Sequence, residues 1–341
     1  MSEWYAGRRV LITGGLGFLG GHLAVRLVAC GALVTLVDLP ESLSTSHRER
    51  LGDAANLIAY LSCDVRDTER LSPLLSNHDV LFWLAAHGGH LASMQAPLLD
   101  LDVNCRSVAA AVEACRTRNS GLRFVFTSTR QVYGRTESLP IDETHRTRPP
   151  DVNAINKLAA EHYLRLYAEV YGLPTVSLRL TNAYGPQMAL DDPEQGVAGV
   201  LIGQALRGEP LTLYGGDQVR EFTYVDDVVD ALLLAGQQAD ARGECFNLGA
   251  GRAHSLREFA EAVGRIVPVE IRTIPWPAER QAIDTGDIVC DSTRFQQATG
   301  WRPATDLEAG LRTTVQHFQQ QHFQQQHFQQ QHFQQQRVPR A

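Results

Sequence analysis

The sequence lacks most of the features that mark specialised classes of protein. Its 341 residues carry a net charge of -7 and no cluster of basic residues, which argues against nucleic acid or an anionic membrane as the main partner. Arginine supplies almost all of the positive charge, since Lys157 is the only lysine. Residues 1–15 hold a short apolar run that soon reaches glycines, so they predict neither a signal peptide nor a membrane span.

Cysteine is sparse as well. The six cysteines, Cys30, Cys63, Cys105, Cys115, Cys245 and Cys290, are scattered without a CxxC pair. We therefore expect reduced, mostly buried thiols in a cytoplasmic protein. Since no Cys/His cluster has the spacing of metal ligands, the sequence predicts no metal site. It also lacks the glycine pattern of a nucleophile elbow, which leaves a hydrolase unsupported.

Apolar runs alternate with helical stretches through the first half of the chain. The runs lie at 8–15, 33–39, 57–65, 78–86 and 123–129. Continuous apolar strands separated by helices are typical of a parallel sheet that is covered on both faces. The pattern therefore predicts an α/β protein with a doubly wound parallel sheet, the Rossmann arrangement.

The second half of the chain is less regular and predicts a smaller lobe. We assign 1–182 to the Rossmann domain and expect 216–250 to return to it. Residues 183–215 and 251–316 predict a C-terminal substrate lobe at the carboxyl ends of the strands. In the tail, 317–341, HFQQQ occurs four times in tandem. A five-residue step turns each Phe by about 140° around a helix, so no apolar stripe forms. We expect a disordered low-complexity extension, with metal binding by its histidines as the alternative.

Three glycines separate the first predicted strand from the first helix in LITGGLGFLGGHLA. Gly14, Gly17 and Gly20 allow a tight turn, close approach of a pyrophosphate and close packing of helix on strand. Asp38 ends the next predicted strand, where a carboxylate accepts both ribose hydroxyls and repels a 2′-phosphate. These residues predict a dinucleotide site that favours NAD over NADP.

Further motifs follow the glycine turn in a fixed order: CDVRD, WLAA, TSTRQVYG, RLTNAYGP and REFTYVDDV. From about Arg8 to about Leu311 the chain resembles the extended short-chain dehydrogenase/reductase family, specifically its nucleotide-sugar epimerase and dehydratase branch. The resemblance implies bound NAD and a nucleotide-diphosphate sugar as substrate. The implied cofactor-binding residues are Gly14, Leu16, Gly17, Phe18, Leu19, Asp38, Asp64, Val65, Leu84, Ala85, Ala86 and Lys157, with Asp64 facing the adenine.

In that family a Ser or Thr, a Tyr and a Lys form the active site, and the last two are spaced YxxxK. The motifs place the hydroxyl at Thr129 and the lysine at Lys157. The lysine binds the nicotinamide ribose and lowers the pKa of the tyrosine, whose phenolate takes the proton of a sugar hydroxyl. Here the tyrosine position is Asn153, which makes the motif NxxxK, and an amide cannot accept that proton.

The missing general base leaves three possibilities. Another group takes the role, or the chemistry needs no proton there, or the protein binds ligands without turning them over. The candidate groups are His87, His90, Arg130, Tyr133 and Tyr184, each of which also has a purely structural interpretation. We predict Thr129, Asn153 and Lys157 as catalytic residues, with Asn153 orienting the substrate or a relay water.

The residues at the positions where the family contacts its substrate indicate which type of reaction to expect. Where the 4,6-dehydratases of the family carry an Asp–Glu pair, this chain has Arg130 and Gln131, neither of which is a carboxylic acid, so dehydration is disfavoured. Arg130 instead suits an anionic substrate, unless it pairs with a neighbouring carboxylate. Asn182 and Arg220 match residues that contact the nucleotide diphosphate. The predicted substrate-binding residues are His87, Arg130, Asn182, Arg220 and Arg280.

The resemblance thus implies an NAD-dependent nucleotide-sugar epimerase that acts at C4 of a UDP- or dTDP-sugar. Hydride would leave the sugar and return to its other face without net oxidation. The alternatives are an oxidoreductase or decarboxylase of the same fold, and a non-catalytic NAD-binding protein. Members of the family are commonly homodimers, and the resemblance places that interface on the helices around 100–117 and 153–171.

Overall fold

The computed structural model describes residues 3–39, 51–190, 192, 196–238, 242–277 and 284–335, with side chains up to Gln321. Seven parallel strands form the main sheet in the order β10-β6-β5-β4-β1-β2-β3. They are β1 (Arg9–Thr13), β2 (Leu33–Asp38), β3 (Ile58–Ser62), β4 (Val80–Trp83), β5 (Arg123–Thr129), β6 (Thr175–Leu180) and β10 (Glu244–Leu248). The strand order reverses between β1 and β4, and this confirms the predicted doubly wound α/β fold.

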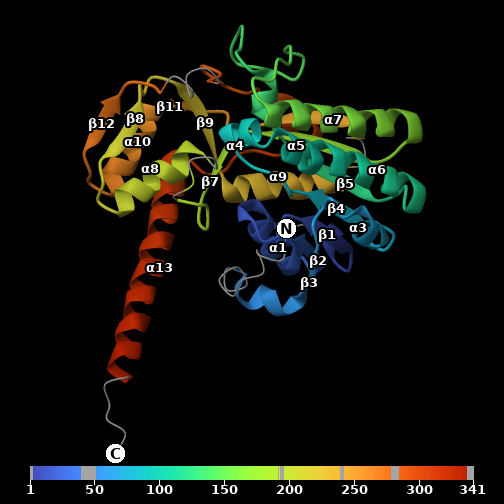
Figure 1. Cartoon of the computed structure of the whole chain (residues 1–341), viewed down its shortest axis with the longest axis horizontal. Helices are drawn as coiled ribbons and strands as arrows, with labels where there is room; N and C mark the ends of the chain where they lie inside the picture. The colour runs from blue at the N-terminus through green and yellow to red at the C-terminus, as the bar shows by residue number, and fades with distance from the viewer. Residues whose placement is uncertain are drawn as a thin grey trace, which may run out of the picture.

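Helices cover both faces of this sheet (Figure 1). In β1, Val10 and Ile12 enter one hydrophobic core and Leu11 enters the other, as the period of two along a strand requires. The first face is covered by α1 (Phe18–Ala29) and α9 (Val225–Gln237), and the second by α3 (Thr68–Leu75), α6 (Ser107–Arg118) and α7 (Val152–Tyr171).

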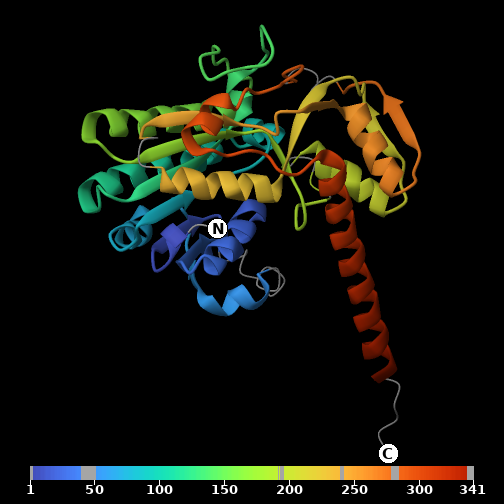
Figure 2. The ribbon, with the colours of Figure 1, turned by 180° about the vertical axis from the view of Figure 1, so that it is seen from behind.

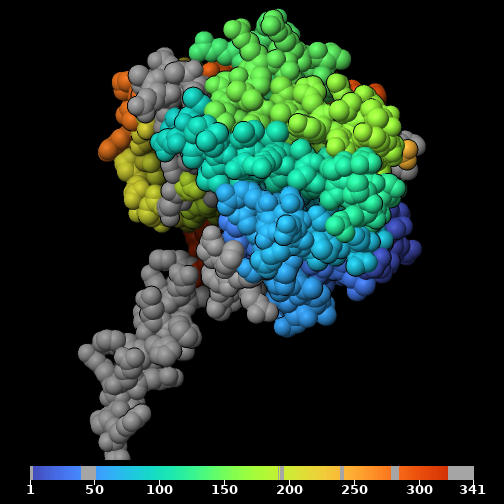
Figure 3. Space-filling model, turned by 45° about the vertical axis from the view of Figure 1, so that its right-hand side comes forward, coloured from blue at the N-terminus to red at the C-terminus, as the bar shows by residue number. Residues whose placement is uncertain are grey.

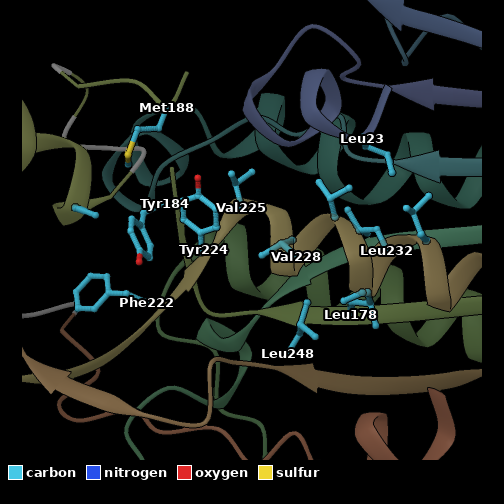
Figure 4. Packing of buried hydrophobic residues seen from close by; sticks show 14 of the residues in the cluster. Leu23, Leu178, Tyr184, Met188, Phe222, Tyr224, Val225, Val228, Leu232 and Leu248 are labelled. Atoms are coloured by element: carbon cyan, nitrogen blue, oxygen red, sulfur yellow. The ribbon is translucent and has the colours of Figure 1, made fainter. Parts of the chain in front are cut away.

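The first of these cores continues into the smaller lobe. Figure 4 shows Leu23 of α1, Leu178 of β6 and Leu232 of α9 in the same layer of buried side chains as Tyr184 and Phe222. All five are at most 4% exposed. A shared core of this kind, in which each large side chain stabilises the fold by about 1.5–3 kcal/mol, fixes the lobe against the sheet.

The smaller lobe is built on two short sheets. One has three strands, β7 (Asn182–Tyr184), β9 (Val219–Tyr224) and β11 (Ala253–Ser255), and the other pairs β8 (Leu211–Tyr214) with β12 (Ile271–Ile274). Two helices pack against them, α8 (Val197–Leu206) and α10 (Leu256–Ile266). The predicted domain boundaries stay a prediction; within 216–250, β9 pairs with β7 and β11, whereas α9 and β10 pack with the main sheet.

Short helical segments complete the fold. They are η1 (Glu3–Tyr5), η3 (Gly52–Leu57), α4 (His90–Gln95), α5 (Pro97–Leu101), η4 (Asp102–Arg106), η5 (Arg130–Tyr133) and α12 (Thr293–Thr299). The segment η4 is a single π-helical turn between α5 and α6. Such turns are frequent at functional sites.

The last helix, α13 (Leu307–Gln335), begins against the lobe, where Leu311 and Val315 are buried, and then runs away from the body (Figures 1 and 2). The sequence predicted no regular structure for the HFQQQ repeat, whereas the backbone is helical to Gln335. The difference has a local cause, since glutamine has a high helix propensity and neither Gly nor Pro interrupts the repeat. Disorder of the tail in solution stays a prediction.

Candidate functional site

The glycine turn between β1 and α1 fits a pyrophosphate. Gly14 has a φ of +67°, and a Cβ at this position would lie 2.7 Å from the backbone nitrogen of Ala85. A Cβ on Gly20 would overlap the carbonyl oxygen of Gly14. Helix α1 begins after Gly17 with no side-chain cap, so its N-terminus is open to a negatively charged group. Only glycine at positions 14 and 20 allows the turn, the first residues of α1 and the Leu84–Ala85 backbone to lie this close.

Two predicted cofactor residues, Asp38 and Asp64, follow neighbouring strands of the sheet. Asp38 ends β2 and holds the glycine turn, since its Oδ2 accepts a hydrogen bond of 2.8 Å from the backbone N–H of Leu16. Asp64 pairs with Arg66 at 2.6 Å, and these hydrogen bonds lower the pKa of Asp64. Both carboxylates therefore make contacts within the chain, and their contacts with ribose and adenine stay predictions.

Lys157 is not a surface lysine. Its Nζ donates a hydrogen bond of 3.0 Å to the carbonyl oxygen of Thr127 near the end of β5, and it lies 4.7 Å from the ring centre of Phe126. The residue is 6% exposed, and burial lowers its pKa to about 8, although the charges of Asp100 and Glu161 oppose this. Burying an ammonium group costs free energy of folding unless the group is paired and hydrogen-bonded. Its contact with the nicotinamide ribose stays a prediction.

Asn153, at the position of the missing tyrosine, uses its amide group within the protein. Its Nδ2 donates to the carbonyl oxygen of His87 at 3.0 Å and to Oδ2 of Asp100 at 3.2 Å. Asp100 is fully buried and also accepts a hydrogen bond of 2.8 Å from Asn156. Neither Asn153 nor His87 is among the described residues that line the adjoining cavity. Their contact with the substrate stays a prediction.

Two tyrosines were candidates for the missing phenol, and both are fully buried structural residues. The hydroxyl of Tyr133 donates to Asn247 at 2.6 Å and accepts from Arg179 at 2.8 Å. The hydroxyl of Tyr184 donates to the carbonyl oxygen of Leu307 at 3.3 Å. Burial raises the pKa of both phenols, so both hydroxyls keep their proton near neutral pH and cannot accept another one. Neither is among the described residues that line the cavity.

A cavity of about 580 Å³ lies where the main sheet meets the smaller lobe. Its walls come from the start of α1, the end of β5, the start of α4 and the strands of the lobe, represented by Phe18, Leu19, His90, Thr129, Asn182 and Arg220. The Thr129 hydroxyl accepts a hydrogen bond of 3.1 Å from the backbone N–H of Gln131, so it still has its own proton to donate. The volume is that of a small-molecule site.

Two buried arginines give this cavity a positive wall. Arg130 donates to Oδ1 of Asn182 at 3.0 Å, and burial together with the charge of Arg220 lowers its pKa to about 10. Arg220 pairs with Asp284 at 2.8 Å, and burial lowers its pKa as well. Both line the cavity, where a guanidinium fork binds carboxylate or phosphate oxygens well. Arg280, the third predicted arginine, lies outside the described residues.

Comparison with known proteins decides the family. Residues 10–249 match the model of the NAD dependent epimerase/dehydratase family. The chain belongs to this family. Membership confirms the predicted resemblance and the predicted cofactor, because the family is NAD dependent and the glycine turn fits a dinucleotide.

Relatives in the epimerase/dehydratase family span nearly the whole chain. A UDP-glucose 4-epimerase of Mycolicibacterium smegmatis is 33% identical over 91% of this chain and 98% of its own length. A UDP-N-acetyl-alpha-D-glucosaminuronate decarboxylase of Bacillus cytotoxicus is 31% identical over 92% and 98%. The crystal structure of the UDP-glucose 4-epimerase of Thermus thermophilus with NAD superimposes with a TM-score of 0.79 and 33% identity, covering 91% of this chain and 99% of the other.

Of the predicted site residues, the structure brings Phe18, Leu19, Thr129, Arg130, Asn182 and Arg220 together around one cavity. Sequence reasoning missed the part played by Asp151 and Asp284, which contact His90 and Arg220 across the site. Asp151 precedes a helix and follows two prolines, which is the signal of an N-cap, but its second contact comes from a distant segment.

Two further features concern the described part of the chain, namely membrane-spanning helices and metal ligands. Within the described ranges, none of the helices combines the length and apolarity needed to cross a bilayer. The same residues contain no group of three His, Cys, Asp or Glu side chains that could hold a metal ion.

Proposed function

We propose that this protein is an NAD-dependent 4-epimerase of a nucleotide-diphosphate sugar, with UDP- or dTDP-sugars as the substrate class. One observation carries the proposal: the first residues of α1 (Phe18 and Leu19), which follow the glycine turn, line one cavity of about 580 Å³ together with Thr129 and the two arginines. A dinucleotide on the turn and a diphosphate on the arginines would meet beside Thr129. The relatives that are UDP-glucose 4-epimerases support the reaction type.

Each side chain has a distinct task in this reaction. When bound, NAD would supply the hydride acceptor of this reaction. Thr129 donates a hydrogen bond to the reacting sugar oxygen, since its own oxygen already accepts from Gln131. Lys157 holds the ribose and supplies positive charge close to the reaction. Once the keto sugar presents its other face, the returning hydride inverts the carbon without net oxidation.

The arginine pair recognises the charged part of the substrate. Arg220 is fixed by Asp284 and keeps further N–H groups for the diphosphate. Arg130 bonds to amide oxygens of Gln131 and Asn182 rather than to a carboxylate, at 3.4 Å and 3.0 Å. A negatively charged ligand group would offset the cost of this buried cation.

That feature of Arg130 also favours a second candidate function. A carboxylate on the sugar would suit the guanidinium, and one relative is a UDP-N-acetyl-alpha-D-glucosaminuronate decarboxylase. In that reaction a 4-keto sugar acid loses carbon dioxide. Release of carbon dioxide from a UDP-uronic acid, without inversion at C4, would favour the second function over the first.

We also propose a homodimer, with α7 and the neighbouring α5–α6 segment as the interface. Figure 3 shows these elements side by side on one face, in green and teal. In α5 and α7 the apolar side chains of Leu98, Ile155, Leu166 and Val170 are 50–75% exposed. Large exposed apolar side chains on two helices that pack against each other suit an interaction site.

Turnover of nucleotide sugars tests the proposed function. Purified protein, supplied with NAD, is incubated separately with UDP-glucose, dTDP-glucose, UDP-N-acetylglucosamine and UDP-glucuronic acid, and products are followed by proton NMR. We expect the C4 epimer of at least one sugar with no accumulation of NADH. If every sugar is recovered unchanged, the epimerase proposal is wrong. If carbon dioxide is released instead, the second function replaces it.

A further inference from the structure

A histidine at the mouth of the cavity is held by a buried carboxylate. His90 is the first residue of α4, and its Nδ1 lies 2.8 Å from Oδ2 of Asp151. The carboxylate of Asp151 is fully buried, whereas the His90 side chain is 42% exposed and lines the cavity together with Thr129. One end of the ring is thus fixed inside the protein and the other end is accessible.

Asp151 is itself held rigidly. It is the N-cap of α7, where its Oδ1 accepts a hydrogen bond of 2.8 Å from the backbone N–H of Ala154. The helix N-terminus favours the negative charge of the carboxylate. Asp151 also lies two residues before Asn153, so the His90–Asp151 pair is anchored beside the position that the family tyrosine would occupy.

This contact sets the tautomer of the imidazole. A carboxylate only accepts hydrogen bonds, so the proton of the neutral ring lies on Nδ1. The lone pair is then on Nε2, and no described residue forms a hydrogen bond with that atom. A histidine oriented by a carboxylate, with Nε2 free to take a proton, is the arrangement used for general bases in hydrolytic triads.

The other candidates for the missing base do not share this geometry. His87 faces the buried Asp100 and is not among the described cavity-lining residues. Tyr133 and Tyr184 are fully buried within the fold. Arg130 lines the cavity, but its guanidinium carries no lone pair for a proton.

We propose that His90, oriented by Asp151, exchanges the proton that the family tyrosine would otherwise handle. The role rests on the proposed epimerase function. As the C4 carbon loses a hydride to NAD, the bond between the C4 oxygen and its hydrogen breaks and Nε2 takes the proton. The carbinol is oxidised to a ketone and NAD is reduced. When the hydride returns, Nε2–H gives the proton back to the oxygen, and the imidazole is neutral again.

Three variants test this role. His90→Gln removes the base, and Asp151→Asn removes the orienting charge while keeping a residue that caps helices well. His162→Gln, an exposed histidine on α7, is the matched control. We expect kcat of His90→Gln to fall by about 10²- to 10⁴-fold, the range for a positioned proton-transfer group. For Asp151→Asn we expect a loss of about 10²-fold, because the correct tautomer is no longer enforced.

A structural role would give a different pattern. We expect KM, NAD affinity by calorimetry and Tm to change little in His90→Gln, and imidazole added to a His90→Ala variant to restore part of the rate through the open cavity. Nitrogen NMR of the wild type should show the Nδ1–H tautomer of His90, and Asp151→Asn should shift it.

The outcomes separate this role from the proposed function. If the wild type epimerises a sugar and His90→Gln does so equally well, or if imidazole gives no rescue, His90 is not the base and the epimerase proposal stands. If the wild type turns over no nucleotide sugar, the epimerase function is wrong, and the role of His90 with it.

Discussion

At the scale of single residues, the site depends on polar groups that are buried away from water. Lys157 illustrates this most clearly, because the chain has no other lysine and places this one in the core beside the end of β5. Burial of this charged group lowers the stability of the fold, and its role in the reaction is our proposal. Asp100 and Asn153 nearby satisfy each other and build the wall behind the site.

Lys157 should make stability depend on pH in a defined direction. Its pKa is about 8 in the folded protein and 10.5 in a free side chain. Below pH 8 the folded protein bears the full penalty of the buried charge. As pH rises from 8 towards 10.5, the amine is neutral when folded but still charged when unfolded, so the penalty declines.

The test compares the wild type with Lys157→Met, since other groups titrate alike in both. The wild type should gain about 2 kcal/mol in free energy of unfolding relative to the variant between pH 7 and pH 10. Urea denaturation at the two pH values measures the difference. An unchanged difference would show that the amine is solvated rather than buried.

At the scale of elements, the strands and the glycine turn were predictable because their signals are local. Apolar runs fix the strands, and the spacing of Gly14, Gly17 and Gly20 fixes the turn. The assignment of β9 to the lobe was not predictable, because it depends on pairing with β7 and β11, far away in the sequence. The contact of His90 with Asp151 was not predictable for the same reason, because it joins residues that are distant in the sequence.

The glycine turn offers a prediction with a matched control. Gly14→Ala places a methyl group against the backbone of Leu84 and Ala85 at a φ of +67°, whereas Gly7→Ala meets nothing within 4 Å at a φ of +73°. Both variants carry the strain of a positive φ, which costs about 1 kcal/mol. Gly14→Ala should be less stable than Gly7→Ala in urea and should lose NAD affinity in calorimetry. Equal NAD affinity in the two variants would contradict the cofactor site.

At the scale of the whole molecule, the account predicts two copies joined through α7. Ile155→Glu and Val170→Glu put charges on the exposed apolar face, and Leu57→Glu changes an equally exposed leucine of η3 outside it. Light scattering should give twice 37.6 kDa for the wild type and for Leu57→Glu, and a single chain for the double variant. A monomeric wild type would refute the dimer.

The family and its cofactor could be identified from motifs, whereas the oligomer and the tail could not be settled in the same way. The glycine motif reports a backbone geometry that this chain needs around a dinucleotide, as the close approach of Gly14 to Ala85 shows. An exposed apolar side chain such as Val170 shows only that an apolar surface is open to solvent. The HFQQQ repeat carries no periodic apolar stripe, and of its described side chains Phe318 packs against the core as a partly buried residue.

Deuterium at C4 of the sugar follows the hydride that leaves and returns. UDP-glucose labelled with deuterium at C4 is incubated with the wild-type protein and NAD, or with the deuterated form of whichever sugar proves to be the substrate, and the product is analysed by NMR and mass spectrometry. The account predicts an inverted C4 that keeps its deuterium, because the same hydride leaves and returns. Exchange of the label with solvent, or an unlabelled inverted product, would contradict it.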